Sequence, residues 1–396
     1  MHRQFAAFLC WSCTAAATAA LLYHARFLFF VDFDSVLDKS IFDTAFYFLT
    51  GLGHESFAVF FVADGIVTGI LLLAGRRLPS LAHGRQRQGI WRPALKKLAA
   101  LYAVLLPGLL LGALADTAGV TLFNGSGLYT DYPALINLTL TLPAFAGNLL
   151  MLEPAIVPTF GSNAMLYLLA YLAWSLAALT AFAGAAALGK PLSTLARVAI
   201  ALSVLLLMPY SFLPWMAIWL LGIAVVLLGE SGRAALAPWV GMVLFLALLL
   251  LSRVIGSQEG LLSTPLGGVI GDGRYVLVGA GFAVLARALY PRASLRGDDA
   301  AGAIAAGAFA ADAERRYGVA TFLFFFHMPL LLLLVGASAD LLGQPLMRQP
   351  DWPVYAAFAA IVAASCALTA LFGHAVAAAV QWLVGASRRA TSGMRR

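Results

Sequence analysis

About ten long apolar runs divide this chain of 396 residues, and they constrain its fold more than any other feature. A transmembrane helix needs about 20 mostly apolar residues, and most of the runs reach or approach that length. Soluble domains carry roughly 25% charged residues, whereas this chain has only 11%. The sequence therefore predicts a single all-α polytopic membrane domain over residues 1–396. The expected spans are Phe5–Phe30, Ser56–Gly75, Leu98–Ala115, Met165–Leu188, Val198–Phe212, Trp215–Leu228, Leu236–Ile255, Tyr275–Leu289, Tyr317–Val335 and Val354–Val380.

The lysine and arginine residues predict how the chain is oriented. If the N-terminus lies in the cytoplasm, the cytoplasmic connections hold most of these residues, and the basic loop 76–97 is the densest of them. Cytoplasmic loops of membrane proteins carry such an excess. An even number of spans then leaves the C-terminus in the cytoplasm as well. Because topology accounts for the net charge of +7, the charge gives little support to a nucleic-acid partner.

Two other connections are long. Residues 291–316 are rich in Ala and Gly and carry charges, so we expect a flexible cytoplasmic linker. The outer connection from Asp116 to Asn163 contains the apolar stretch Leu138–Leu152. That stretch is too short to span the bilayer comfortably. It either re-enters the membrane or lies at its surface.

The cysteines and the N-terminus give two further expectations. Cys10 and Cys13 form a CxxC pair in an apolar helix, but the sequence offers no second cysteine pair and no nearby histidine pair to complete a zinc site. We therefore expect no metal. The N-terminus has the look of a signal peptide, yet its apolar run extends to Phe30 and contains His24 and Arg26, which favours a retained first helix.

Ionisable residues inside spans are candidates for function, because burying them is costly. His24 lies about six residues before the outer end of its span, roughly 9 Å deep at 1.5 Å per residue, and Asp64 lies roughly 12 Å deep in the next span. Sequential antiparallel helices are usually neighbours, so the two side chains could face each other. A carboxylate can orient a histidine that acts as a general base. Alternatively, Asp64 forms a structural ion pair with Arg26 or Arg253.

Two other groups of residues allow both a functional and a structural interpretation. His327 lies near mid-membrane, where a histidine is often satisfied by an interhelical hydrogen bond. Arg92, Lys96 and Lys97 close the basic loop on the cytoplasmic side. Topology alone explains some of this charge, and anionic lipid headgroups are a further explanation. A docking surface for a phosphorylated donor is the third, because arginine binds phosphate oxygens with two parallel hydrogen bonds.

Five blocks of the sequence resemble the membrane-bound acyltransferase 3 family, whose members include O-antigen and exopolysaccharide O-acetyltransferases. They occur in the family's order, and ten helices fit its usual count. The chain departs from the pattern at Cys13 and Ala100, where the family has arginine, at Asp64, where it has serine, and near Leu172, where it has glutamate. The resembling blocks are Ala15–His24, Val59–Gly65, Lys96–Tyr102, Phe160–Tyr167 and Phe322–Leu330.

The resemblance implies an activity and its site. An acyl-CoA, expected to be acetyl-CoA, serves as the donor substrate, and no cofactor is bound. Its phosphates lie near Arg92, Lys96 and Lys97 on the cytoplasmic side of a bacterial inner membrane. His24, with Asp64 as its expected partner, removes the proton from a hydroxyl of an extracytoplasmic glycan, which attacks the thioester. The other expected binding residues are Arg26, Asn163, Tyr167, Arg253 and His327.

Two other functions stay open at this point. A transporter or flippase for a glycan or lipid predicts discontinuous helices and two pseudo-symmetric halves, although we find no internal repeat. A non-catalytic membrane partner of other polysaccharide-synthesis proteins is supported by the missing family arginine and glutamate. It predicts that His24→Ala leaves the phenotype intact.

Overall fold

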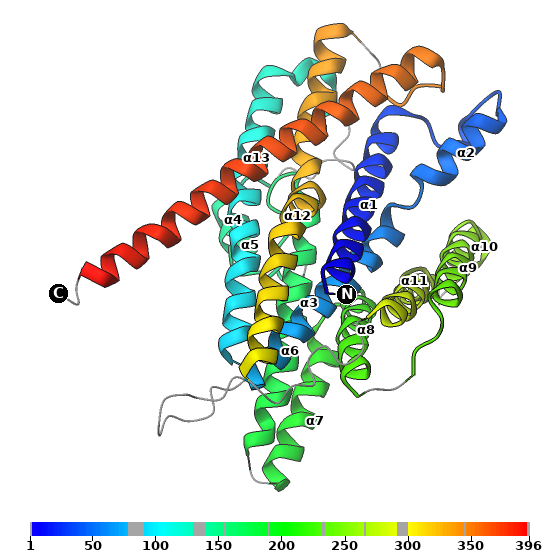
Figure 1. Cartoon of the computed structure of the whole chain (residues 1–396). Coiled ribbons are helices and arrows are strands. Elements are labelled where there is room, and N and C mark those ends of the chain that lie inside the picture. The colour runs from blue at the N-terminus through cyan, green and yellow to red at the C-terminus, as the bar shows by residue number, and fades with distance from the viewer. Residues whose placement is uncertain are drawn as a thin grey trace. The chain divides into compact units, whose positions relative to one another are not determined.

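The computed structural model is built almost entirely of helices (Figure 1). Among the described residues it contains no strand, only an isolated bridge between Phe30 and Arg348. The structure describes residues 2–77, 91–129, 139–153, 155–188, 190–231, 234–264, 267–290, 300–343 and 346–393. The α-helices are α1 (His2–Phe29), α2 (Ile41–Thr50), α3 (Gly53–Arg77), α4 (Trp91–Leu122), α5 (Leu142–Leu149), α6 (Tyr167–Gly184), α7 (Lys190–Leu207), α8 (Phe212–Glu230), α9 (Pro238–Gly256), α10 (Glu259–Leu262), α11 (Gly267–Leu289), α12 (Ala300–Leu342) and α13 (Trp352–Gly393).

Ten apolar stretches of the described chain are long enough to cross a membrane, which confirms the predicted all-α, multi-pass class. Helices dominate because backbone amides and carbonyls find no water in lipid and must be paired within the segment. The second stretch runs from Ile41 to Leu73 and joins α2 to α3, so it begins well before the expected Ser56. The cytoplasmic location of both termini stays a prediction.

Two expected loops are partly helical. Helix α12 begins at Ala300, so the second part of the expected linker 291–316 is helical, and residues 291–299 lie outside the described residues. Alanine has the highest helix propensity, which explains why this Ala-rich segment extends the helix. Similarly, α4 begins at Trp91, so the end of the basic loop 76–97 is the first turns of a helix. Residues 78–90 lie outside the described residues.

The stretch Leu138–Leu152 contains one short helix. Helix α5 runs only from Leu142 to Leu149, and eight residues rise about 12 Å. The side chain of Thr141 accepts from the amide of Ala144 and begins the helix. A helix of this length is too short to span a membrane by itself, and whether the stretch re-enters the membrane or lies at its surface stays a prediction.

The contacts between Cα atoms divide the expected single domain into two compact units. Unit 1 comprises residues 1–16, 52–101 and 168–317, and unit 2 comprises residues 17–51, 102–167 and 318–396. Each unit is assembled from three separated segments, so neither corresponds to one half of the sequence.

Helices α3 and α8 of unit 1 pack closely against each other. A Cβ atom placed on Gly65 would lie 2.1 Å from the carbonyl oxygen of Trp219, and one on Gly222 would lie 2.1 Å from the carbonyl oxygen of Val62. Only glycine permits so close an approach of two backbones, and small residues are enriched where helices pack in membranes. This contact positions the polar residues of α3 described below.

In unit 2, α1, α4, α12 and α13 carry the core. The aromatic rings of Phe30, Phe46, Tyr355 and Phe358 lie within 4.9–5.6 Å of one another by centroid distance in five pairs. Aromatic pairs at such separations stabilise a core beyond the area they bury. The cluster holds the end of α1 against the start of α13, and it fixes the part of α1 that carries His24.

Candidate functional site: a histidine pair in unit 2

Two histidines that are far apart in the sequence meet in unit 2. The Nδ1 atom of His24 on α1 lies 2.9 Å from the Nε2 atom of His327 on α12. Their rings are nearly parallel, with 5.2 Å between the centroids. His24 is half-buried, whereas His327 is fully buried. The two imidazoles therefore form one hydrogen-bonded pair with a buried and a more accessible member.

A third group determines which ring nitrogens carry protons. The Nδ1 atom of His327 lies 2.7 Å from the carbonyl oxygen of Leu323, and a carbonyl can only accept. His327 therefore donates from Nδ1, and its neutral Nε2 is an acceptor. His24 must then donate from its own Nδ1, which leaves the lone pair of a neutral His24 on Nε2. The backbone of α12 thus fixes the tautomers of both rings.

This arrangement gives His24 a partner of the kind a general base requires. In hydrolase triads, an acceptor behind the histidine holds the correct tautomer and orientation. Here the acceptor is His327. The interhelical hydrogen bond expected for His327 is therefore the bond that orients His24. Sequence reasoning singled out both residues, but it did not pair them.

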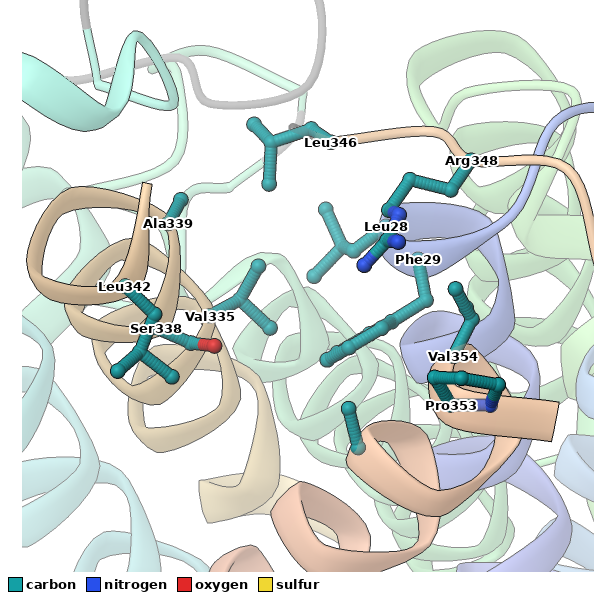
Figure 2. A pocket seen from close by; sticks show the side chains of 11 residues that line it. Leu28, Phe29, Val335, Ser338, Ala339, Leu342, Leu346, Arg348, Pro353 and Val354 are labelled. Atoms are coloured by element: carbon teal, nitrogen blue, oxygen red, sulfur yellow. The ribbon is translucent and has the colours of Figure 1, made fainter. Parts of the chain in front are cut away.

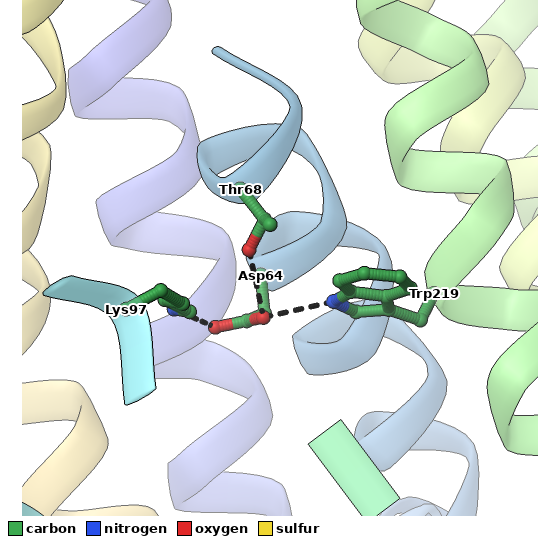
Figure 3. Close-up of polar contacts among 4 residues, drawn as sticks. All are labelled: Asp64, Thr68, Lys97 and Trp219. Carbon is green, nitrogen blue, oxygen red and sulfur yellow. Dashed lines mark hydrogen bonds and ion pairs between the residues drawn. The ribbon is translucent and has the colours of Figure 1, made fainter. Parts of the chain in front are cut away.

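Asp64 does not have the partner that the sequence suggested. Its carboxylate accepts from the ammonium of Lys97, with 2.5 Å between Oδ1 and Nζ, and from the indole of Trp219, with 2.9 Å between Oδ2 and Nε1 (Figure 3). Thr68 donates at 3.4 Å. All four residues belong to unit 1. The expected pairing with His24, and the alternative ion pairs with Arg26 and Arg253, are replaced by an ion pair with Lys97.

The same contact corrects the role expected for Lys97. Its side chain is buried and committed to Asp64, so its ammonium is not presented to a phosphate. Arg92 and Lys96 are exposed and lie four residues apart on α4, which places them on one face of its first turns. Their expected role in binding the phosphates of a donor stays a prediction.

Two other expected binding residues occupy unrelated surroundings. The guanidinium of Arg26 in unit 2 lies 5.0 Å from the ring centroid of Tyr47 and 5.7 Å from that of Tyr23, which are cation–π distances. Arg253 belongs to α9 in unit 1. Of the expected site residues, unit 2 contains His24, Arg26, Asn163, Tyr167 and His327, and unit 1 contains Asp64, Arg92, Lys96, Lys97 and Arg253.

Asn163 lies in a buried polar region of unit 2 that the sequence did not reveal. Asp116, expected at the edge of an outer loop, is fully buried in α4 and accepts from the amide of Ser162 at 2.7 Å and from its hydroxyl at 2.5 Å. Asn163 is also fully buried, and neither atom of its amide has a hydrogen-bond partner among the described residues. The same holds for the hydroxyl of Tyr129. Buried polar atoms are normally satisfied by protein, water or ligand.

Two titratable groups between Asp116 and Asn163 have raised pKa values. Burial, and secondly the charge of Asp116, raise the pKa of the Tyr129 hydroxyl. Burial raises the pKa of Glu153 to about 7, although a hydrogen bond from Thr159 opposes the shift. Glu153 is therefore close to half-protonated at neutral pH.

The structure offers no cluster of metal ligands. Among the described residues, no group of three His, Cys, Asp or Glu side chains is placed to hold a metal ion. Cys10, Cys13 and Cys366 form no disulfide in the described part of the chain.

Comparison with known proteins finds no family model, no curated protein and no solved structure that matches this chain. The resemblance to the acyltransferase 3 family thus depends on the five sequence blocks alone.

Proposed function

We propose that this multi-pass membrane protein is an O-acyltransferase. It transfers an acyl group, by resemblance an acetyl group, from acyl-CoA at the cytoplasmic face of a bacterial inner membrane to a hydroxyl of an extracytoplasmic glycan. The observation that carries the proposal is the His24–His327 pair, whose tautomers place a basic lone pair on Nε2 of His24. A hydroxyl is a weak nucleophile at its ordinary pKa, so its attack on a thioester needs such a base.

In the proposed reaction His24 accepts and returns a proton, and His327 orients it. Nε2 of His24 accepts the hydroxyl proton as the oxygen attacks the thioester carbonyl. The new C–O bond forms, the C–S bond breaks, and the resulting imidazolium returns its proton to the departing thiolate. His327 keeps His24 oriented and accepts a stronger hydrogen bond from Nδ1 while the ring is charged.

Other residues have supporting roles in the proposal. Arg92 and Lys96 bind the phosphates of the donor, because both are exposed cations on one helical face. The amide of Asn163 binds a polar group of the acceptor, since both of its polar atoms are buried without a protein partner in the described chain. Lys97 and Asp64 hold unit 1 together rather than contact substrate.

The test is acyl transfer in membrane vesicles that receive radiolabelled acetyl-CoA on the cytoplasmic face. We expect His24→Ala to lower labelling of glycan by about 100-fold or more, the usual contribution of a general base. His374→Ala is the matched control, because His374 is exposed on α13 and its Nδ1 also bonds a backbone carbonyl. If the wild type transfers no acetyl, succinyl or other common acyl group, the role of a non-catalytic partner in polysaccharide synthesis replaces this proposal.

A transporter is the second candidate, favoured by one observation. Asp64 and Lys97 are opposite charges buried inside spans, and such residues often mark ion or proton pathways. Substrate-dependent proton movement into proteoliposomes that is abolished by Asp64→Asn would support transport. Acyl transfer that survives Asp64→Asn without any such movement would exclude it.

A further inference from the structure

Unit 2 contains a cavity that the proposed reaction does not use. Its volume is about 190 Å³, and its walls come from the end of α1, the end of α12 and the start of α13 (Figure 2). Leu28, Phe29, Val335 and Val354 are among the residues of its apolar wall. An engineered apolar cavity of about 150 Å³ in another protein stays dry and holds a benzene ring. The present cavity therefore has room for a short segment of one hydrocarbon chain.

Two polar groups face this apolar space. The hydroxyl of Ser338 and the guanidinium of Arg348 both point into it (Figure 2). Arginine presents five donors in a planar fork that matches the oxygens of a phosphate. An apolar wall with a cation at its edge is complementary to an amphiphile that carries a phosphate on a hydrocarbon chain.

The backbone around Arg348 is held against α1. Its amide donates to the carbonyl of Phe29 at 2.8 Å, and its carbonyl accepts from the amide of Val31 at 3.1 Å. These bonds satisfy backbone groups at a helix end, which otherwise lack partners. The preceding Met347 has a left-handed φ of 51°, a conformation that costs about 1–2 kcal/mol outside glycine. The chain thus accepts strain at the turn that brings Arg348 to the cavity.

The cavity lies close to both the membrane boundary and the histidine pair. The apolar spans of α1 and α12 end at Phe29 and Leu342, and that of α13 begins at Trp352, so the cavity is at the end of three spans. Leu28 follows His24 by four residues, which is about 6 Å along the same face of α1. A headgroup bound at Arg348, whose amide bonds the carbonyl of Phe29, would therefore lie about 8 Å further along the direction of α1 than His24, a distance that an attached sugar can span.

We propose that this cavity binds the lipid end of the acceptor, a glycan linked through phosphate to a long hydrocarbon chain. The inference rests on the proposed function, since it identifies the class of acceptor presented to His24. The apolar walls hold the proximal part of the chain, Arg348 binds the phosphate, and the attached glycan extends toward the imidazole pair. The rest of the chain stays in the bilayer, because the cavity admits only a segment.

The test uses direct binding, which does not depend on acyl transfer. Purified protein in lipid nanodiscs is exposed to a tritiated polyprenyl phosphate with a photoreactive group in its first isoprene units. We expect label in peptides of α1 and α12 that line the cavity. Ala339→Phe, which fills the space from α12, and Arg348→Gln should each lower labelling about tenfold or more. Leu341→Phe is the matched control, because Leu341 is 72% exposed on the same helix and does not line the cavity.

Three results would overturn the inference. They are an absence of label at the cavity in the wild type, labelling unchanged by Ala339→Phe, and equal competition by excess phosphatidylglycerol, which would make the cavity a general site for bilayer phospholipid. The acyl-transfer assay, with wild type and His24→Ala, separates this inference from the proposed function. If the wild type is labelled at the cavity but transfers no acyl group, only the proposed function fails. If acyl transfer depends on His24 but labelling ignores the cavity variants, only this inference fails.

Discussion

The buried pair of Asp64 and Lys97 gives the sharpest quantitative prediction about stability. The two residues are 5% and 8% exposed, and the carboxylate also accepts from Trp219. Removing one member of a buried ion pair typically costs about 3–5 kcal/mol, because the remaining charge is left uncompensated. Lys97→Met leaves the Asp64 carboxylate with only the neutral donors of Trp219 and Thr68. We therefore expect this single change to lower the free energy of unfolding by about 3 kcal/mol or more.

The double variant distinguishes an ion pair from two independent packing contributions. Asp64→Asn keeps an oxygen for Trp219 but leaves the Lys97 ammonium unpaired, so it should also be strongly destabilising. In Asp64→Asn/Lys97→Met no charge remains buried, and the loss should be smaller than the sum of the single losses by at least about 1 kcal/mol. The assay is reversible unfolding of the protein in mixed micelles, followed by the fluorescence of its tryptophans and by circular dichroism. Single losses below about 1 kcal/mol that add in the double variant would refute the reasoning.

Three further predictions follow from other parts of the chain. His327→Ala removes the acceptor that fixes the tautomer of His24, so kcat for acyl transfer should fall about 10- to 100-fold with little change in the KM for the acceptor; an equal loss with His374→Ala would contradict this. Burial raises the pKa of Glu153 from 4.5 to about 7; the native state then binds the proton more tightly than the unfolded chain, so the stability that this group contributes is present below about pH 4.5 and is lost as pH rises to about 7. Glu153→Gln should therefore flatten the decrease in melting temperature between pH 5 and pH 8, and an unchanged profile would show that Glu153 is not its source. Gly65→Val should prevent α3 from reaching α8, because its Cβ would lie 2.1 Å from the Trp219 carbonyl oxygen; Gly273→Ala, with no neighbour within 4 Å of the added atom, should leave the yield of folded protein unchanged.

The sequence was sufficient to predict ten apolar stretches of helix long enough to cross a membrane, although not the short helices α2, α5 and α10. In lipid every backbone polar group must be paired internally, so an apolar run of adequate length has essentially one conformation. Helix ends were predicted less well, because hydropathy indicates which residues lie in the membrane and a helix can extend beyond them. The first turns of α4, from Trp91, are helical although charged, and α12 extends back to Ala300 on alanine propensity.

The candidate site shows the same division. The cost of burying ionisable groups singled out His24, Asp64 and His327 in the sequence, but it could not say which groups meet. His24 forms a hydrogen bond with His327, a residue 303 positions away. Asp64 forms an ion pair with Lys97. Lys97 had been expected to bind phosphate, because it lies at the end of a basic segment. The cavity beside Arg348 was not predicted from the sequence, since its wall consists mainly of ordinary apolar residues from three helices and the connection between α12 and α13.

The sequence by itself determined that this chain forms membrane-spanning helices and which of their residues are too polar to be there without a reason. Only the tertiary structure decided the partners, because they depend on the rotation of each helix about its axis and on its closest neighbour. These are set by contacts such as the glycine approach of α3 and α8 and the aromatic cluster at the end of α1. Hydropathy carries no information about either, since lipid-facing and helix-facing apolar residues are alike in composition.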